Sequence, residues 1–208
     1  MVFKSPYSLT VPNVDYLSYI FSSTVFQPDE KVWIEANDPE NFITRSRALE
    51  LTQRIGVGLQ DVGISRPKSE DEERCIVLLI SENQIMVPVT MYAIINAGGV
   101  VCTAPTQASS FEIARQIKSC LPKLVICSPS VLENVVKGVK ESVLPDLKVA
   151  TMSSAQRRQE LKLSDGKSLI SERKLEFERI TDEDTLKKRV LFLGYSSGTT
   201  GVPKGVHI

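Results

Sequence analysis

The sequence predicts an α/β fold with a mostly parallel sheet flanked by helices. Short apolar runs rich in β-branched residues alternate with segments whose apolar residues recur every three or four positions. The run from Cys75 to Ile80 is apolar on both faces, as expected of an interior parallel strand. Strand and helix alternating in units of this length predict a parallel sheet joined by right-handed crossover helices.

The predicted elements follow in order. Thr44 can cap a first helix over about 45–62, and Gly63 can end it. After a polar loop at 66–74 comes the strand 75–80. The later predicted elements are a helix at 84–97 ended by Gly98-Gly99, a strand at 100–103, a helix opened by the capping-box spacing of Ser109 and Glu112 and reaching about 121, a strand at 123–127, a helix at 130–140 and a strand at 147–151.

Residues 156–189 have a different composition. More than half of their side chains are charged, both signs are mixed, and apolar residues are few. Such a pattern is typical of a solvated surface. We therefore expect a charged connecting region with some short helix.

Composition excludes several classes of function. Lys plus Arg and Asp plus Glu are both 25, so the formal net charge is zero, which argues against a nucleic-acid partner. His207 is the single histidine of the sequence, so a Ser-His-Asp triad or a His-rich metal site is not expected. Apolar residues make up 42% of the chain, enough for a sizeable core.

The cysteines and the N-terminus indicate the compartment. Cys75, Cys102, Cys120 and Cys127 form no CxxC pair and are expected to be reduced thiols packed as small hydrophobes. The first residues lack the apolar core of a secretion signal. Residues 83–111 carry no charge, but their Pro, Gly, Asn and Gln residues favour a buried helix, turn and strand over a transmembrane segment. An intracellular protein, cytoplasmic or peroxisomal, is expected.

The last residues, 190–208, carry the chemistry. An apolar strand at 190–193 leads into a turn of small hydroxyl residues and glycines, then Lys204 and the start of another strand. Glycines let backbone N–H groups approach an anion closely, and hydroxyls and an ammonium group add donors. A polyphosphate matches this set of groups. The candidate binding residues are Ser196, Ser197, Gly198, Thr199, Thr200, Gly201 and Lys204.

Two other nucleotide motifs are excluded. A Walker A loop needs Gly-Lys-Ser/Thr beginning five residues after its first glycine, whereas Pro203 stands five after Gly198. Gly56-Val-Gly58 would need a third glycine where the chain has Asp61, and it lies inside a predicted helix. The plain alternative for a turn of small polar residues is a flexible loop without a ligand.

The string from Tyr195 to Val206, Tyr-Ser-Ser-Gly-Thr-Thr-Gly-x-Pro-Lys-Gly-Val, resembles the signature phosphate loop of the adenylate-forming superfamily. The stretch from Ala93 to Val101 is similar to that family's Ala-Gly-Gly region upstream, and 44–63 to the helix after its first strand. The overall pattern is closest to 4-coumarate:CoA-ligase-like acyl-CoA synthetases. By this resemblance, residues 1–208 are an incomplete N-terminal AMP-binding domain, without the small C-terminal domain of the family.

The resemblance implies a two-step reaction. A carboxylic acid attacks the α-phosphate of Mg²⁺-bound ATP, and coenzyme A then displaces AMP to form a thioester. The hydroxyl and glycine residues 196–201 would hold the β- and γ-phosphates, Lys204 would help to neutralise them, and Tyr195 would pack the end of its strand. The family's adenine, ribose and α-phosphate motifs have no counterpart before Ile208. No catalytic residue and no metal ligand is therefore assigned.

Three interpretations stay open. The chain is the N-terminal portion of an ATP-dependent acyl- or aryl-CoA ligase and is inactive by itself, or it is a non-catalytic module that binds nucleotide or a partner. In the third interpretation it binds no ligand. The sequence predicts no oligomeric state and does not identify the carboxylic acid.

Overall fold

The computed structural model describes residues 6–8, 10, 12–22, 27–69, 72–196 and 204–208. Within these residues the chain forms a seven-stranded sheet in the order β7-β6-β5-β3-β4-β8-β9 and a separate β1-β2 hairpin. The five inner strands of the large sheet are parallel, and the outer strands β7 and β9 are antiparallel to their neighbours. This arrangement confirms the predicted α/β fold with a mostly parallel sheet.

The predicted alternation of strands and helices is observed with small shifts at the ends. The elements of this part are α2 (Arg45–Gln60), β3 (Ile76–Ile80), α3 (Met86–Ala97), β4 (Val100–Thr103), α4 (Ser110–Cys120), β5 (Leu124–Cys127), α5 (Leu132–Lys140) and β6 (Val149–Ser153). A 3₁₀ turn at Pro129–Val131 precedes α5.

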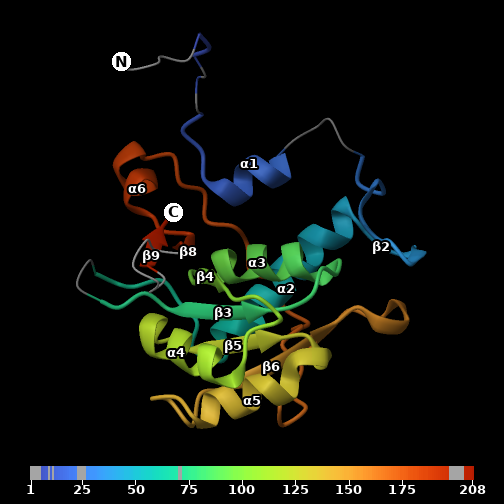
Figure 1. Cartoon of the computed structure of the whole chain (residues 1–208). Coiled ribbons are helices and arrows are strands. Elements are labelled where there is room, and N and C mark those ends of the chain that lie inside the picture. The colour runs from blue at the N-terminus through green and yellow to red at the C-terminus, as the bar shows by residue number, and fades with distance from the viewer. Residues whose placement is uncertain (1–5, 9, 11, 23–26, 70–71, 197–203) are drawn as a thin grey trace.

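The large sheet is covered on both faces. In Figure 1, α2 and α3 lie above the sheet and α4 and α5 below it. Side chains of β3 alternate between the two layers: Val77 and Leu79 pack with the α2–α3 layer, and Leu78 and Ile80 with the α4–α5 layer. All four are almost completely buried. A strand enclosed on both sides explains why its sequence is apolar without alternation.

Local signals fix the helix ends as predicted. Thr44 caps α2 by accepting a hydrogen bond from the backbone N–H of Arg47 at 3.2 Å. Ser109 and Glu112 form both bonds of a capping box at the start of α4. Gly98 ends α3 with a φ of 94°, and a Cβ there would lie 2.4 Å from the backbone nitrogen of Arg66. Glycine is therefore required at this turn for both conformation and space.

The charged region 156–189 holds more structure than predicted. Strand β7 (Glu160–Leu163) pairs antiparallel with β6 and extends the sheet, which the sequence analysis did not expect. The few apolar side chains of the region face the core, and the fully or nearly buried ones are Leu161, Leu163, Leu169 and Ile180. The expected short helix is α6 (Glu183–Lys188). Few apolar residues are enough to attach this region to the core, because each of these four side chains is buried.

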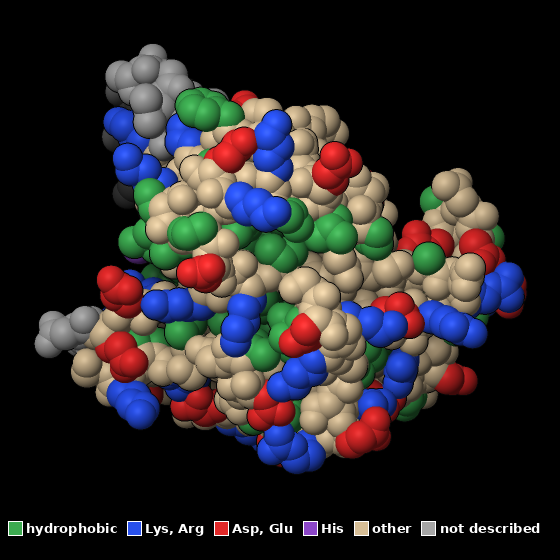
Figure 2. Space-filling view, turned by 90° about the horizontal axis from the view of Figure 1, so that it is seen from below, with side chains coloured by type: hydrophobic (Ala, Val, Ile, Leu, Met, Phe, Trp, Pro, Cys, Tyr) green, Lys and Arg blue, Asp and Glu red, His purple; other side chains and the backbone are tan. Residues whose placement is uncertain are grey.

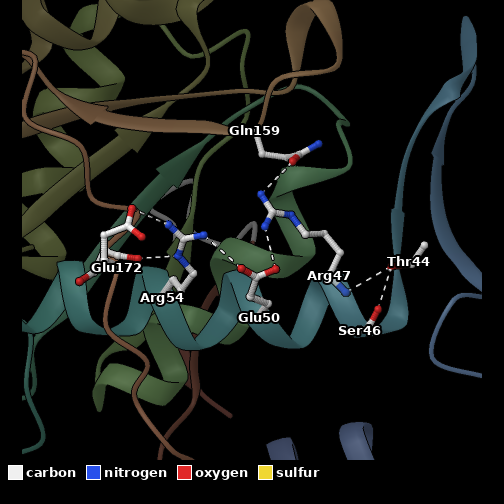
Figure 3. A network of polar contacts seen from close by, with 8 residues as sticks. Thr44, Ser46, Arg47, Glu50, Arg54, Gln159 and Glu172 are labelled. Carbon is white, nitrogen blue, oxygen red and sulfur yellow. Dashed lines mark hydrogen bonds and ion pairs between the residues drawn. The ribbon is translucent and has the colours of Figure 1, made fainter.

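Polar side chains also bind this region to α2 (Figure 3). Arg47 contacts Glu50 at 2.8 Å and donates to the side chain of Gln159 at 3.2 Å. Arg54 contacts Glu50 and Glu172, both at 3.1 Å. Exposed ion pairs of this kind each contribute little to stability. Their effect is to orient the charged segment along the outer side of α2.

The N-terminal part contains three elements that the sequence analysis did not predict: α1 (Tyr16–Ser22), β1 (Lys31–Glu35) and β2 (Asp38–Thr44). Asp15, just before α1, joins this part to the charged region. Its backbone N–H donates to the carbonyl of Ile180 at 3.0 Å, and its carboxylate accepts from the Ile180 N–H at 3.3 Å. The start of the chain is thus tied to a segment far along the sequence.

Among the described residues, no helix combines the length and the apolar character that crossing a membrane requires. On the face shown in Figure 2, Lys and Arg side chains are interspersed with Asp and Glu. Neither sign dominates this face, as the zero net charge suggests.

Gly58 provides a test of the packing between α2 and the charged region. A Cβ at Gly58 would lie 2.0 Å from the carbonyl oxygen of Leu169, so Gly58→Ala must displace backbone. We expect the substitution to lower the free energy of unfolding by about 1–3 kcal/mol, measured by urea denaturation.

Gly56→Ala is the matched control, two positions away in the same helix. Its Cβ would meet the side-chain amide of Asn96 at 3.0 Å, which can move, and alanine favours a helix over glycine by about 0.5–1 kcal/mol. Equal losses in the two variants would contradict a special contact at Gly58.

Candidate functional site

The candidate phosphate loop is framed by a hairpin at one side of the sheet. Strand β8 (Phe192–Ser196) runs parallel to β4, with Val101 opposite Phe192 and Cys102 opposite Leu193. Strand β9 (Lys204–His207) returns antiparallel, so that Ser196 pairs with Lys204 and Tyr195 with Gly205. The pairing brings the first and last of the predicted binding residues together at the base of the loop.

The predicted binding residues are described only in part. Ser196 is the last residue of β8, and Lys204 is the first residue of β9 with an exposed side chain. The remaining predicted residues, Ser197, Gly198, Thr199, Thr200 and Gly201, lie outside the described residues. Their role in holding phosphate therefore stays a prediction.

Tyr195 anchors the end of β8 to the helical layer below. Its hydroxyl donates a hydrogen bond to Oγ of Ser119, in α4, at 2.8 Å. Burial of the ring raises the pKa of the Tyr195 phenol, because the charged form loses water. The ring also packs against the apolar cluster between the sheet and α4–α5. These contacts agree with the expectation that Tyr195 packs the strand end.

The parallel strands direct their carboxyl ends to the same edge of the sheet, where β8 also leads into the loop. In open α/β sheets ligands bind at this edge, near the point where successive connections leave on opposite faces. Here β3 is followed by α3 on one face and its neighbour β5 by α5 on the other. The predicted phosphate loop leaves the sheet at this same carboxyl edge, after β8, two strands away from β3.

A polar cluster that the sequence analysis missed follows β3 and β5 at this edge. Ser130 donates a short hydrogen bond to the carboxylate of Glu82, and the hydroxyls of Ser128 and Ser130 are 3.1 Å apart. These two serines, Ser130 first, hold the pKa of Glu82 below its usual value. The signal that could have found the cluster is position, since each residue stands within three places of the end of a predicted strand.

A second group of contacts joins the β1-β2 hairpin to the same edge. One oxygen of the Glu35 carboxylate accepts from the hydroxyl of Ser154 at 2.7 Å and from the backbone N–H of Ile85 at 3.1 Å. Ser154 follows β6, and Ile85 precedes α3. Glu35 therefore fixes two of the edge loops relative to each other.

In the part of the chain that the structure describes, no group of three or more His, Cys, Asp or Glu side chains is arranged to hold a metal ion. His207 lies in β9 and is exposed. Taken together, the fold and the hairpin define an α/β protein with a candidate anion-binding loop at the carboxyl edge of its sheet.

Comparison with known proteins identifies the family. The model of the AMP-binding enzyme family matches residues 23–208. The chain belongs to this family, and the resemblance to adenylate-forming enzymes is confirmed.

The related proteins are named as acyl-CoA synthetases or CoA ligases. A protein of Emericella nidulans named as an acyl-coenzyme A synthetase is 31% identical over 94% of this chain and 36% of its own length. A 4-coumarate–CoA ligase-like protein of Arabidopsis thaliana is 25% identical over 94% of this chain and 33% of its own length. The chain thus spans about a third of the length of these relatives.

A solved structure shows the same fold. The anthranilate CoA ligase AuaEII, crystallised with anthranoyl-AMP, superimposes with a TM-score of 0.70 at 15% identity, over 95% of this chain and 34% of that one. At this identity the likeness concerns the fold alone.

The Tyr195–Ser119 contact can be tested by a double-mutant cycle. Tyr195→Phe and Ser119→Ala should each lower the free energy of unfolding by about 0.5–1.5 kcal/mol, because each removes one partner of the same hydrogen bond. The double variant should cost less than the sum of the two, as measured by urea denaturation. Strict additivity would mean that the bond does not hold β8 to α4.

Proposed function

We propose that this chain is the N-terminal portion of an ATP-dependent acyl- or aryl-CoA ligase. The proposed reaction joins a small carboxylic acid to AMP, releases pyrophosphate, and then transfers the acyl group to the thiol of coenzyme A. The observation that carries the proposal is the segment from Tyr195 to Val206, which includes the end of β8 and the start of β9 at the carboxyl edge of the sheet.

The proposed role of the loop is to hold the phosphates of ATP. Backbone N–H groups and hydroxyls of residues 196–201 would bind the β- and γ-phosphate oxygens, and the ammonium group of Lys204 would balance their charge. The pairing of Ser196 with Lys204 supports this role, since it brings the two ends of the loop close together. Holding the phosphates positions the α-phosphate for attack, which is a large part of catalysis in phosphoryl chemistry.

Mg²⁺ is proposed as the companion of ATP. Nucleotide sites usually hold this ion through one or two carboxylates together with the substrate phosphates. Bound in this way it would neutralise charge that develops on the phosphoryl oxygens. No residue among the 208 is assigned to it.

The isolated chain is proposed to bind nucleotide without turning it over. The family motifs for adenine, ribose and the α-phosphate, which the resemblance places after the phosphate loop, have no counterpart in the 208 residues. The polypeptide would therefore bind the β- and γ-phosphates of ATP. It would lack the groups that bind adenine, ribose and the α-phosphate.

Lys204 gives the direct test. Isothermal titration of the 208-residue chain with MgATP should show weak, saturable binding that weakens as salt is raised. Lys204→Ala should reduce the affinity about 10- to 150-fold, because one charge-assisted contact is worth about 1.5–3 kcal/mol. Lys174→Ala is the matched control: this side chain is also exposed, lies between β7 and α6, and should leave the affinity unchanged.

Three outcomes would contradict the proposal. If a folded chain bound no MgATP, or if both lysine variants bound as tightly as the original, the phosphate-holding role would be wrong. Carboxylate-dependent pyrophosphate exchange by the isolated chain would instead show that the catalytic groups lie within the 208 residues.

Binding without any turnover is also the outcome expected of a non-catalytic nucleotide module. Exchange measured on a longer chain that contains the later motifs distinguishes that module from a ligase portion.

A further inference from the structure

A pocket of about 740 Å³ lies at the opposite edge of the sheet from the phosphate loop. Its walls come from four segments: the loop between α2 and β3, the Gly98-Gly99 turn between α3 and β4, helix α6, and residues 189–190, which lead into β8. Strands β3, β4 and β8 are parallel and begin beside these segments. The pocket therefore lies at the amino ends of the strands, and we call it the amino-edge pocket.

Cationic side chains outnumber acidic ones in the described lining of the amino-edge pocket. Glu72 and Asp184 are the acidic side chains of this lining. The chain as a whole has no net charge, so an excess of three positive charges is a local feature. The cationic lining residues are Arg66, Lys68, Arg74, Lys188 and Arg189.

The floor of the pocket is closely packed backbone. The glycine turn lies directly against the loop that carries Arg66, since a Cβ at Gly98 would come within 2.4 Å of the Arg66 nitrogen. A Cβ at Gly99 would lie 3.2 Å from the carbonyl oxygen of Cys75, just before β3. Close packing of this kind fixes the backbone from which the Arg66 side chain extends.

The Arg189 guanidinium lines the pocket from a half-buried position. Its Nη2 donates to the carbonyl of Ile95 at 3.3 Å, which attaches the side chain to the end of α3. Burial first, and then the charge of Arg66, lower the pKa of Arg189. Glu178, which pairs with Arg66, and Asp15 act in the opposite direction with smaller effect. The neighbouring carboxylates thus balance the positive charge at this place in part.

We propose that the amino-edge pocket binds a small molecule that carries two phosphoryl groups. Its volume falls within the range of about 300–1,000 Å³ that is usual for small-molecule sites and exceeds what one inorganic anion fills. Arginine binds phosphate oxygens through paired N–H bonds, and three of the lining cations are arginines. Two phosphoryl groups supply the negative charge that the excess of cations requires. The proposal is independent of the proposed ligase function, because the described residues of the phosphate loop take no part in this pocket.

Arginine side-chain NMR tests the proposal on the folded 208-residue chain. Pyrophosphate without Mg²⁺ is the probe, and the assigned Nε–H signals are followed at mildly acidic pH, where these protons exchange slowly. The signals of Arg66, Arg74 and Arg189 should shift together and saturate, and the affinity should fall as salt is raised. Arg115, exposed on α4 and outside the pocket, should not shift. Residues 196–204 contain no arginine, so these signals report on the amino-edge pocket and not on the phosphate loop.

Two substitutions of opposite sign make the result specific. Arg74→Ala removes an exposed cation of the pocket and should weaken pyrophosphate binding about two- to fivefold, as expected for an exposed charge pair. Asp184→Asn removes an acidic lining residue and should strengthen binding by a similar factor. Arg115→Ala is the matched control and should leave the affinity unchanged. Succinate at the same ionic strength should bind about tenfold more weakly, because it carries less charge and fewer acceptor oxygens.

The proposal is overturned if the Arg66 and Arg189 signals stay in place as pyrophosphate is added, or if Arg115 shifts as far as they do. It is also overturned if Arg74→Ala and Asp184→Asn change the affinity in the same direction or leave it unchanged. Succinate binding as tight as that of pyrophosphate would mean that phosphate is the wrong ligand class. MgATP binding that depends on Lys204 is measured separately, so the failure of one proposal does not imply the failure of the other.

Discussion

Enclosure of the parallel sheet between two helical layers is the constraint on which the rest of the structure depends. Strand β3 has helices over both faces, and its side chains from Val77 to Ile80 are almost fully buried. Burying one large aliphatic side chain contributes roughly 1.5–3 kcal/mol, so a strand buried on both faces is a strong organiser. Its neighbours β4 and β5 are held in fixed register, and β8 takes its position from β4. The location of the candidate loop follows from that order.

The second constraint is the covering of the α2–α3 layer by charged sequence. Residues 156–189 would be expected in solvent, yet the chain at Leu169 approaches α2 so closely that only glycine fits at position 58. Arg47 and Arg54 keep their charges at the outer side of α2 and orient the segment, whereas the buried leucines hold it (Figure 3). The charged side chains of this segment therefore lie on its outer side, and its buried apolar side chains lie on the side that faces the core.

The family membership and the geometry both support a nucleotide site at the carboxyl edge of the sheet. The edge collects the loops after β3, β5, β6 and β8, and polar side chains such as Glu82 and Glu35 hold three of these loops in place. The loop that resembles a phosphate site follows β8. The chain covers about a third of the length of these relatives. The proposed role of the present residues is to hold the phosphates of ATP.

The sequence by itself determined the α/β class, the order of the central strands and helices, and the caps at Thr44, Ser109 and Gly98, because these depend on neighbours a few residues apart. It also determined the family, through the string from Tyr195 to Val206. Tertiary structure alone decided the pairing of β7 with β6 and the approach of Leu169 to Gly58. These join residues distant in sequence, and they form only when burial of the shared core brings the segments together.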